Sequence, residues 1–574
     1  MRRWILKEDG PVADPASVGT DGPPRLVRRL LRSRGIDGVA PTRRWLNPAL
    51  EDRYDPSLLS DLDRAVARVD EALRRDERIL VFGDYDVDGI TSAAILKRYL
   101  DGLGGAVRVR IPQRLSEGYG LSIAAVDEAH AWGASLILTA DCGTTAVQEI
   151  AHARRCGIDV VVLDHHIPGP VLPEAVAIVN PHREESRVPF RDLAAVGVTS
   201  KLLEGIHRLR RGGDATAQGP EDLLDLTALG TIADGMPMIG ENRILVRQGL
   251  RLMRASPRPA LAALASASGL NPRRIRSSEI AFQMVPRLNA AGRLGDSNAA
   301  LDLLLSDDPE RCRVLASTLD AHNSRRRELL DKVVRESVSA ADVEQAAHRG
   351  EPIVLVSDRW HPGVVGIAAS RIAERFRVPA ILLASDGAIA RGSGRSAGDY
   401  DLLELVRAAS GDLLSFGGHR SAVGLTLEAA HFPRFRDEIL VAARTRPVAI
   451  TIGGEALQID ARAAVSEIDR TLLDWLDRFE PFGPGNEEPV LAVRGRIVGG
   501  VRVLKEKHLR FDLGAEGERR ECIGFGLAEH AARLEAAEGD VHFAVVASRN
   551  VWNGEERLQL QVRDIAFADP FGNV

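Results

Sequence analysis

Aspartate and histidine side chains recur in short segments of the first half of the chain, each directly after an apolar run or a helical pattern. The segments are GDYDVDG (83–89), TADCG (139–143), LDHH (163–166) and TIADG (231–235). Carboxylates gathered in one place repel one another unless cations neutralise them. Carboxylate and imidazole ligands together suit Mn²⁺ or Mg²⁺ better than a metal that prefers thiolates. A pair of such ions can hold the attacking and leaving oxygens of a displacement at phosphorus, so the segments predict a two-metal centre for phosphate chemistry.

Each segment also has an ordinary structural interpretation. DxDxDG resembles a calcium loop, but such a loop continues to a glutamate at a fixed offset, and here ITSAAIL follows. Asp141 taken alone is more often a helix-capping residue than a ligand, and Asp234 alone is unremarkable. His165 and His166 could form a structural pair, although adjacent histidines after an apolar strand need polar partners. Taken together and in this order, the acidic termini favour the metal centre, with Asp141 a candidate to bridge two ions.

Apolar strands that alternate with helices must position these segments. We predict strands at Arg78–Phe82, Val107–Ile111, Leu136–Ala140, Asp159–Leu163 and Ala177–Val179, and helices at Ile90–Leu100, Ser122–Ala131, Thr144–Cys156 and near Asp222–Ile232. This alternation indicates an α/β fold with a parallel sheet covered on both faces. Ligands of such a sheet bind outside the carboxyl ends of its strands. The acidic strand ends are therefore expected to converge on one crevice.

The rest of the chain is predicted to form connecting helices, a second α/β unit and a small barrel. The second unit begins at Ile353–Ser357, continues through a helix near Val364–Phe376 and a strand at Ala380–Leu383, and contains the glycine-rich RGSGRS. Later segments such as His508–Leu513, Val541–Val546 and Arg557–Val562 alternate apolar and polar residues, as strands of a small antiparallel barrel do. The predicted regions are an N-terminal extension (1–60), the first α/β domain (61–298), connecting helices (299–347), the second α/β domain (348–447) and the barrel (448–574).

Composition bounds the class of protein. The chain has 574 residues, 45% of them hydrophobic, which is enough for several cores. The net charge of -6 does not exclude a nucleic-acid partner, because phosphate contacts need a local basic groove and not a basic total. The 4 cysteines form no CxxC pair, so a disulfide framework is not expected. We therefore expect a cytoplasmic location. The start lacks an apolar signal segment, and no stretch approaches the ~18 apolar residues of a membrane span, so no membrane partner is expected.

The order of the acidic segments resembles the DHH phosphoesterase superfamily. Further motifs, PRLNAAGRLGD, HPGVVGIAASRI, GSGRS, FGGH and EPFGPGNEEP, are similar to those of RecJ single-strand exonucleases, and the resemblance spans roughly residues 45 to 500. It implies a DHH parallel-sheet domain, a smaller α/β domain of the DHHA1 type joined to it by long helices, and a C-terminal OB-like β-barrel. It also implies a 5′→3′ exonuclease that hydrolyses phosphodiester bonds of single-stranded DNA in repair and recombination, with two divalent cations, Mn²⁺ or Mg²⁺.

The resemblance assigns roles to the acidic and histidine residues. Metal ligands would be Asp86, Asp88, Asp141, His165 and Asp234, with Asp84 a ligand or a supporting carboxylate. The catalytic residues would be Asp141, Asp164 and His166. His166 would contact the scissile phosphate, and Asp164 would orient a histidine.

The resemblance also implies residues that bind the DNA strand. Ser393, Arg395 and Ser396 would hold a terminal 5′-phosphate, and His419 would approach the centre from the opposite side, although ordinary glycine turns are the alternative. Of the residues in PRLNAAGR, Arg287, Asn289 and Arg293 are candidates, and Arg293 is favoured near phosphate. Arg114 could contact phosphate and Tyr119 could stack on a base, with a surface arginine as the alternative. The barrel offers basic residues and aromatic rings for a strand: Arg494, Arg496, Arg502, Lys505, Lys507, Arg510, Phe511 and Trp552.

Two rival functions remain at this point. One is a DHH-type oligoribonucleotide or cyclic-dinucleotide phosphodiesterase, but such enzymes are typically shorter and lack a barrel. The other is a non-catalytic DNA-binding relative, which is expected to have lost metal ligands that are complete here. A single-strand binding protein and a RecQ-type helicase are implied as partners only by the family's role in repair.

Overall fold

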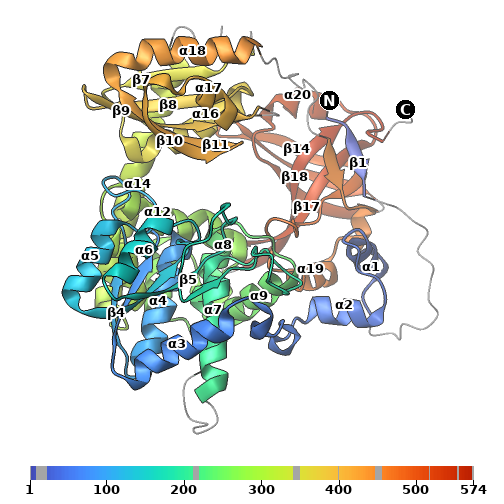
Figure 1. Cartoon of the computed structure of the whole chain (residues 1–574). Coiled ribbons are helices and arrows are strands. Elements are labelled where there is room, and N and C mark those ends of the chain that lie inside the picture. The colour runs from blue at the N-terminus through green and yellow to red at the C-terminus, as the bar shows by residue number, and fades with distance from the viewer. Residues whose placement is uncertain are drawn as a thin grey trace.

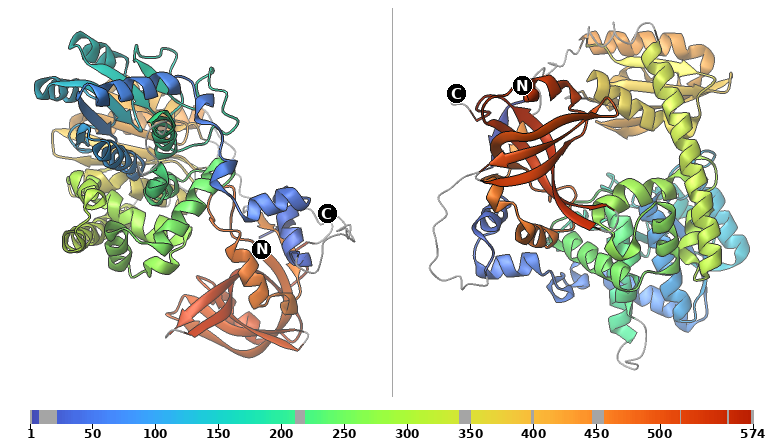
Figure 2. Two further views of the ribbon diagram at one scale, coloured as in Figure 1. Left: turned by 90° about the horizontal axis from the view of Figure 1, so that it is seen from below. Right: turned by 180° about the vertical axis from the view of Figure 1, so that it is seen from behind.

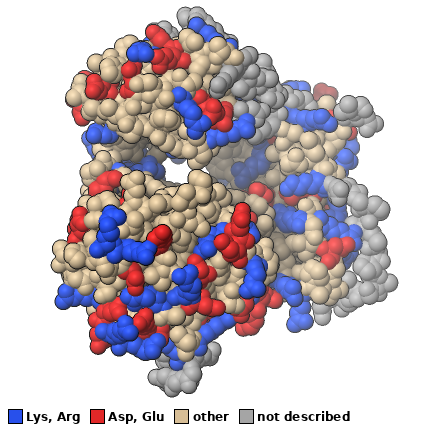
Figure 3. All heavy atoms as spheres, viewed as in Figure 1, with Lys and Arg blue, Asp and Glu red and all other residues tan. Residues whose placement is uncertain are grey.

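Three folded domains surround an opening in the molecule. The computed structural model describes residues 2–7, 22–210, 219–340, 350–397, 400–445, 456–515, 517–552 and 555–571. The first α/β domain lies at the bottom of Figure 1, the second above it and the C-terminal barrel to the right. Figure 3 shows an opening between the two α/β domains, with Lys and Arg side chains beside it. The predicted boundaries at 347/348 and 447/448 lie outside the described residues.

The first domain contains a five-stranded sheet of order β3-β2-β4-β5-β6 in which every neighbouring pair is parallel. Its strands are β2 (Arg78–Gly83), β3 (Ala106–Arg110), β4 (Ala134–Ala140), β5 (Asp159–Leu163) and β6 (Ala177–Val179). The predicted parallel sheet is confirmed, and the predicted strands match these within two residues. The carboxyl ends of β2, β4 and β5 lie side by side because these strands are neighbours.

Helices cover both faces of this sheet because consecutive apolar residues of its central strands point to both faces. Ile79 and Val81 of β2 face one core, whereas Leu80 and Phe82 face the other. The helices of the first face are α3 (Leu62–Arg74), α4 (Val87–Gly102), α7 (Ala195–Arg210), α8 (Leu224–Ala233), α9 (Gly240–Ala255), α10 (Pro259–Ala267) and α12 (Val285–Arg293). The opposite face carries α5 (Ile123–Trp132) and α6 (Val147–Arg155).

One long helix joins the two α/β domains. After the short α13 (Asn298–Leu305), α14 (Pro309–Ser339) runs for 31 residues. It begins at Asp308, whose side chain accepts a hydrogen bond from the backbone of Glu310. Figure 2 shows α14 running from the first domain to the second. The predicted long helical connection is thus confirmed.

The second domain is a mixed five-stranded sheet of order β10-β11-β9-β8-β7. Its elements are β7 (Ile353–Ser357), α16 (Pro362–Phe376), β8 (Ala380–Ser385), β9 (Ile389–Arg395), α17 (Leu402–Ala408), β10 (Leu413–His419), β11 (Ala422–Glu428) and α18 (Phe432–Thr445). The glycine-rich segments GSGRS and FGGH are parts of β9 and β10, not turns. A Cβ on Gly394 would lie 2.8 Å from Val423 on β11, so glycine is required where the strands and helices pack closely.

The C-terminal domain is a barrel of five strands. Its strands are β14 (Leu491–Leu504), β15 (His508–Ala515), β16 (Glu518–Gly524), β17 (Val541–Trp552) and β18 (Glu555–Ala566), and pairing of β14 with β17 closes it. The barrel predicted from alternation is confirmed, but its β16–β18 pair is parallel. The short α20 (Ala531–Glu535) lies between β16 and β17 and allows this crossover.

The N-terminal segment packs on the C-terminal domain. Strand β1 (Trp4–Leu6) pairs with β12 (Leu457–Ile459), and α1 (Arg25–Arg32) buries Leu26, Val27, Leu30 and Leu31 in the barrel's core, near α19 (Arg470–Asp477). These apolar residues recur at helical spacing, which explains why one face of α1 is buried. The next helix, α2 (Val39–Leu46), adds Leu46 to the same core. Among the described helices, none is both long and apolar enough to cross a bilayer.

Candidate metal centre and phosphate pocket

The acidic and histidine segments meet at the carboxyl edge of the first sheet. Asp84 follows β2, Asp141 follows β4, His165 lies just after β5 and Asp234 follows α8. Their donor atoms approach within 4.8 Å of one another in overlapping groups. The groups are Asp84–Asp86–Asp141, Asp88–His165–Asp234 and Asp141–His165–His166. All the residues predicted to hold metal therefore face a single space.

Local backbone geometry fixes the aspartates of GDYDVDG. Asp86 caps α4, and its Oδ1 accepts hydrogen bonds from the backbone N–H groups of Asp88 (2.9 Å) and Gly89 (3.1 Å). Asp88 is buried, and its two oxygens accept the N–H groups of Ala195 (2.7 Å) and Val196 (2.9 Å). A Cβ at Gly89 would lie 2.5 Å from the backbone nitrogen of Asp84, so the turn needs glycine there. The first turn of α7 thereby positions a carboxylate that comes from α4.

Asp141 occupies the middle of the group in a left-handed backbone conformation, with φ of 65°. Its Oδ1 lies 3.3 Å from His165 Nε2 and 3.8 Å from His166 Nδ1. His165 Nε2 is also 3.6 Å from Asp234 Oδ2, so one imidazole lies between two carboxylates. This arrangement agrees with a bridging position for Asp141.

Asp164 orients His166. Its Oδ1 accepts the backbone N–H groups of His165 (2.8 Å) and His166 (3.2 Å) and lies 2.7 Å from His166 Nδ1. Its Oδ2 accepts the backbone N–H of Thr144 at 3.0 Å. Burial alone would raise the pKa of Asp164, but these hydrogen bonds hold it well below its usual range. With Nδ1 bonded to Asp164, the Nε2 atom of the half-exposed His166 ring is left for another partner.

Asn180 belongs to the site but was missed by the sequence analysis. It is fully buried directly after β6, and its Nδ2 donates to Thr144 Oγ1 (3.0 Å) and to the carbonyl of His166 (2.8 Å). It thus supports both the residue that bonds Asp164 and the histidine that Asp164 orients. Its place at the end of a strand next to β5 was the available signal, but the strand is only 3 residues long.

Electrostatics and unmet hydrogen bonds show that the centre fits a cation. Asp84 Oδ1, Asp141 Oδ1 and Asp234 Oδ2 are buried and lack a hydrogen-bond partner among the described residues. Burial, together with the charge of Asp86, raises the pKa of Asp84 to about 8 and that of Asp234 to about 7, and raises that of Asp141 strongly. Burial lowers the pKa of His165 to about 4, so its ring is neutral and able to ligate. Oxygens arranged in this way are stabilised by divalent cations.

Tyr119 contacts this centre through its hydroxyl group. The hydroxyl donates to the carbonyl of Asp141 at 3.1 Å and lies 3.2 Å from His166 Nδ1. Burial and the charge of Asp164 raise the pKa of Tyr119, so the hydroxyl stays protonated. The ring stands edge-on to His166, with centroids 5.6 Å apart, and the residue is 51% exposed. An exposed ring beside the centre remains available to stack on a base.

A cluster of arginines lies where the two α/β domains meet. Burial, followed by the charges of Arg114, Arg326 and Arg395, lowers the pKa of Arg293 to about 9. The only hydrogen bond described for the Arg293 guanidinium is a long one, 3.4 Å to the carbonyl of Gly363 at the start of α16. Arg114 lies over the ring of Tyr85, 4.5 Å from its centroid. Several cations with few acceptors form an arginine cluster suited to an anion.

The second domain contributes Arg395 to this arginine cluster, and Ser393 lies beside it. Arg395 donates to Ser393 Oγ at 2.8 Å, and both are half-buried on β9. A Cβ on Gly366 of α16 would lie 3.1 Å from Ser393 Oγ and 3.5 Å from Arg395 Nη2. Gly366 therefore leaves room beside these polar groups. Arg326, from α14, is a further cation here that the sequence analysis did not select.

Other predicted contact residues lie elsewhere or already have partners. Arg287 is buried and bonds Asp320 (2.9 Å) and the carbonyl of Gln283 (2.6 Å), so its guanidinium is used within the first domain. Ser396 donates to the carbonyl of Tyr400 at 2.7 Å. Asn289 is half-buried one helical turn before Arg293, on the same face of α12. His419 is exposed, and its described hydrogen bond is with Ser421 at 3.0 Å.

The barrel residues divide into paired and unpaired groups. Phe511 is buried in the barrel core, so the expectation that it stacks on a base is wrong, and the side chain of Trp552 lies outside the described residues. Arg494 and Arg496 pair with Asp540, and Arg510 pairs with Glu521. No described ion pair involves the exposed residues Arg502, Lys505 or Lys507. An exposed aromatic ring that the sequence analysis missed is Phe525, 53% exposed and 5.3 Å from His508.

Comparison with known proteins identifies the domains. Residues 78–231 match the DHH family, N-terminal domain, residues 350–444 match the DHHA1 domain, and residues 459–564 match the RecJ OB domain. The single-stranded-DNA-specific exonuclease RecJ of Salmonella typhimurium is 36% identical over 572 residues, covering 96% of this chain and 97% of that protein.

Solved structures agree with the sequence relatives. The crystal structure of RecJ from Thermus thermophilus in complex with Mn²⁺ has a TM-score of 0.76 and 32% identity, covering 95% of this chain and 78% of that one. The structure of the same protein with Mg²⁺ has a TM-score of 0.71 and 31% identity, with 95% and 77% covered. The expected cofactors, Mn²⁺ or Mg²⁺, are thus the ions found in these relatives. The chain is therefore a member of the RecJ family of single-stranded-DNA-specific exonucleases.

Proposed function

We propose that this chain is a metal-dependent exonuclease that removes nucleotides from the 5′ end of single-stranded DNA. One observation carries the proposal: buried carboxylate oxygens that lack a hydrogen-bond partner among the described residues lie in the same molecule as a separate cluster of arginines that have no described ion pair. The first site fits cations and the second fits a phosphate. RecJ relatives are named as exonucleases specific for single-stranded DNA, which supports this substrate.

We propose that two divalent cations are held by the residues that share the carboxyl edge of the sheet. One group would be Asp84, Asp86 and Asp141, and the other Asp88, His165 and Asp234. Asp141 Oδ1 also lies 3.3 Å from His165 Nε2, so Asp141 would lie between the two groups. When bound, such cations neutralise phosphate charge and make hydroxide available near neutral pH.

His166 would contact the scissile phosphate. Burial lowers its pKa, but the hydrogen bond and charge of Asp164 outweigh burial and raise that pKa above the usual value. A protonated ring held by Nδ1 can donate from Nε2 to a phosphate oxygen, and the charge that develops there in the transition state strengthens the bond. Asp164 and Asn180 keep the ring in this orientation.

The phosphate pocket would set the direction of cleavage. Arg114 and Arg293 come from the first domain, whereas Ser393 and Arg395 come from the second. A strand whose terminal 5′-phosphate occupied this pocket would present its next phosphodiester to the metal centre. Asn289 would line the same side as Arg293, and His419 would approach from the second domain.

Degradation of a long single strand with a 5′-phosphate or a 5′-hydroxyl end tests this proposal. We expect 5′→3′ release of nucleotides that requires Mn²⁺ or Mg²⁺, stops with chelator and prefers the 5′-phosphate end. Arg395→Met should remove that preference by raising KM about tenfold or more, while kcat changes less. Release from the 3′ end, or faster cleavage of dinucleotides than of long strands, would contradict the proposal.

The cellular role follows from the family. We propose action in DNA repair and recombination, with a single-strand binding protein and a RecQ-type helicase as partners, because the family resemblance implies these. We also propose a cytoplasmic location. All 4 cysteines are free, which agrees with a reducing compartment.

A further inference from the structure

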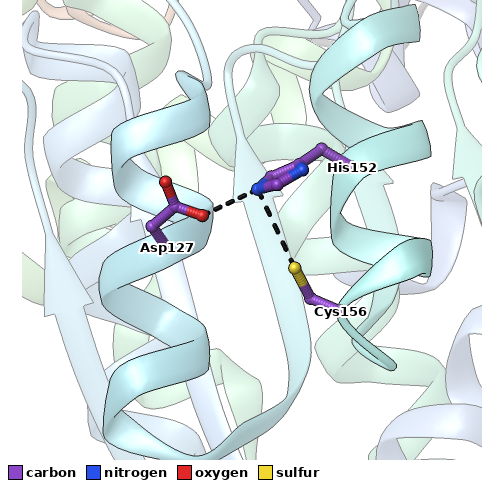
Figure 4. A group of neighbouring side chains, drawn as sticks. All are labelled: Asp127, His152 and Cys156. Atoms are coloured by element: carbon purple, nitrogen blue, oxygen red, sulfur yellow. Dashed lines mark hydrogen bonds and ion pairs between the residues drawn. The ribbon is translucent and has the colours of Figure 1, made fainter.

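Asp127, His152 and Cys156 form a second group of metal-binding side chains, on the helical layer of the first domain. Figure 4 shows Asp127 on one helix facing His152 and Cys156 on its neighbour. Asp127 Oδ1 lies 2.7 Å from His152 Nε2, and Cys156 Sγ lies 3.8 Å from the same nitrogen. One donor atom of each residue lies within 4.8 Å of the others. The three donor atoms thus converge on one point.

This group is separate from the catalytic centre. Asp127 lies in the middle of α5, and His152 and Cys156 lie at the end of α6. Helix α6 starts after β4 and returns to the start of β5, so its last turn lies toward the amino ends of the strands. The catalytic residues are at the carboxyl ends. The two sites therefore lie toward opposite edges of the sheet.

Helical spacing explains why two donors come from α6. Residues four apart lie on the same face of a helix, so His152 and Cys156 point together toward α5. Cys156 ends α6, and Gly157 follows with φ of 75°, which turns the chain toward β5. The thiol borders the apolar core of this face, whereas the Asp127 side chain is 60% exposed. The group is accessible from solvent on the Asp127 side, and Cys156 is held in place by its contact with the apolar core.

The geometry does not suit a catalytic triad. In a triad the acid bonds one imidazole nitrogen and the nucleophile bonds the other. Here the carboxylate and the thiol both approach Nε2. Tetrahedral zinc with sulfur, nitrogen and oxygen ligands places these donor atoms roughly 3.3 to 3.6 Å apart. The observed separation of Asp127 Oδ1 from His152 Nε2, 2.7 Å, is shorter than these values, and that of Cys156 Sγ from the same nitrogen, 3.8 Å, is longer. The exposed Asp127 side chain is free to adjust.

The donor types select a metal class different from that of the catalytic centre. A thiolate and an imidazole favour zinc over Mn²⁺ or Mg²⁺. A thiolate and a carboxylate balance the charge of a divalent ion, which suits a partly buried position. On binding, the Cys156 thiol would release its proton to solvent, and the His152 proton would reside on Nδ1. Arg155, 3.5 Å from Nδ1, would then turn away.

We propose that Asp127, His152 and Cys156 bind one Zn²⁺ ion that links α5 to α6, with water as the fourth ligand. The ion would connect two helices that flank β4, the strand whose end carries Asp141. Its role would be to stabilise this layer of the domain. The inference does not rest on the proposed nuclease activity.

Cobalt substitution of the full-length protein tests the site directly. Co²⁺ bound to a thiolate gives a near-ultraviolet charge-transfer band, whereas the oxygen and nitrogen ligands of the catalytic centre do not. We expect this band at one equivalent per chain, and we expect its loss in Cys156→Ser and in His152→Ala. Cys142→Ser, next to Asp141, should keep the band. A matched pair on α5 should differ, because Asp127→Asn weakens binding and Glu128→Gln, whose carboxylate pairs with Arg110, does not.

Zinc affinity in competition with a chromogenic chelator gives a second measurement. Loss of Cys156 or His152 should weaken binding by more than about tenfold. Zn²⁺ should raise the melting temperature of the wild type, measured without other metals, by more than that of Cys156→Ser, because the catalytic centre can bind a cation in both proteins. If the Cys156→Ser protein does not fold, His152→Ala provides the same test. A missing band in folded wild-type protein, or a band that persists in both variants, would overturn the proposal.

Discussion

Two regions of this molecule bury charged side chains, carboxylates in one and an arginine in the other. The hydrogen bonds of these side chains are incomplete in the first region and complete in the second. In the metal centre, Asp84, Asp141 and Asp234 each have a buried oxygen without a hydrogen-bond partner among the described residues. At the join between α9 and the C-terminal domain, Arg243 is also buried. It donates to the carbonyls of Trp45 (3.2 Å), Phe479 (2.8 Å) and Arg478 (3.0 Å) and lies 3.8 Å from the centroid of the Trp45 ring.

Whether a buried charge has complete hydrogen bonds distinguishes a structural residue from a ligand-binding one. Burial lowers the pKa of Arg243 to about 9, yet this charge meets backbone acceptors from two other segments and fixes the N-terminal region and the barrel to α9. Asp84 Oδ1, Asp141 Oδ1 and Asp234 Oδ2 receive no hydrogen bond from the described residues, although His165 lies near two of them. A buried charge with its hydrogen bonds complete holds the fold together. One with unmet bonds destabilises the fold and is kept for a ligand.

The largest expected effect is the loss of activity in Asp141→Asn. Asparagine tolerates the left-handed backbone of this position, so the change removes charge with little strain. We expect turnover on single-stranded DNA to fall by about 10³-fold or more. In chelator the melting temperature should stay the same or rise, because an unpaired buried carboxylate is gone. Nuclease assays and thermal unfolding of the same preparation measure both.

Asp159→Asn is the matched control for this variant. Asp159 begins β5, at the opposite end of the strand that Asp164 follows, and pairs with Arg68 at 2.6 Å. It is about half-exposed, so the change should alter stability by less than about 1 kcal/mol and leave activity intact. A clear fall in the stability of Asp141→Asn in chelator would break the comparison.

The second prediction concerns the join. Arg243→Met nearly keeps side-chain volume but removes the described side-chain donor from the carbonyls of Trp45 and Arg478, and one of two such donors from the carbonyl of Phe479. We expect a loss of about 3 kcal/mol, seen as a lower first thermal transition, since a multidomain chain does not unfold in one step. Cleavage of a short substrate should persist at temperatures where the variant is folded. Arg251→Met, exposed on the same helix, should change neither property, and equal destabilisation by both would refute this account.

Much of the fold could be predicted from the sequence because the signals were local. Strands β5 and β7 were predicted to the residue, since apolar runs bounded by Asp or Ser mark a buried parallel strand. The packing of the N-terminal segment on the barrel could not be predicted. Its strand β1 pairs with β12 more than 400 residues later in the sequence, and no local pattern encodes that pairing.

The site shows the same division. The acidic segments were found because each follows its own strand or helix, and the parallel sheet brings such ends together. Side-chain direction was not predictable. Arg287 and Arg293 were both candidates in PRLNAAGR, with Arg293 favoured. Six residues of helix turn them to different faces, and Arg287 bonds Asp320. Phe511 looked available for stacking, but its place in β15 points it into the barrel. Both outcomes depend on contacts between distant segments.

A third prediction sharpens the comparison within the centre itself. The Tyr119 hydroxyl is a neutral group whose bonds, to the Asp141 carbonyl and His166, are complete. Tyr119→Phe should therefore resemble the loss of an ordinary hydrogen bond, about 1 kcal/mol, and lower kcat about tenfold or less. Steady-state kinetics on a long strand measures this. A fall as large as that of Asp141→Asn would mean that the hydroxyl takes part in the chemistry.

The smallest expected effect lies on the barrel, at two lysines that are exposed and take part in no described ion pair. Lys505 and Lys507 are exposed in the turn between β14 and β15. If they contact the strand, the double change to alanine should weaken binding a few-fold. It should also reduce the slope of log affinity against log salt by about 1.4, near 0.7 for each lost phosphate contact.

Arg154→Ala, exposed on α6 and paired with Glu174, is the control and should leave the slope unchanged. If the lysines contact only the strand beyond the metal centre, cleavage of a dinucleotide should be unaffected by the lysine changes. Slower dinucleotide cleavage would show that these lysines act on the centre and not on the strand.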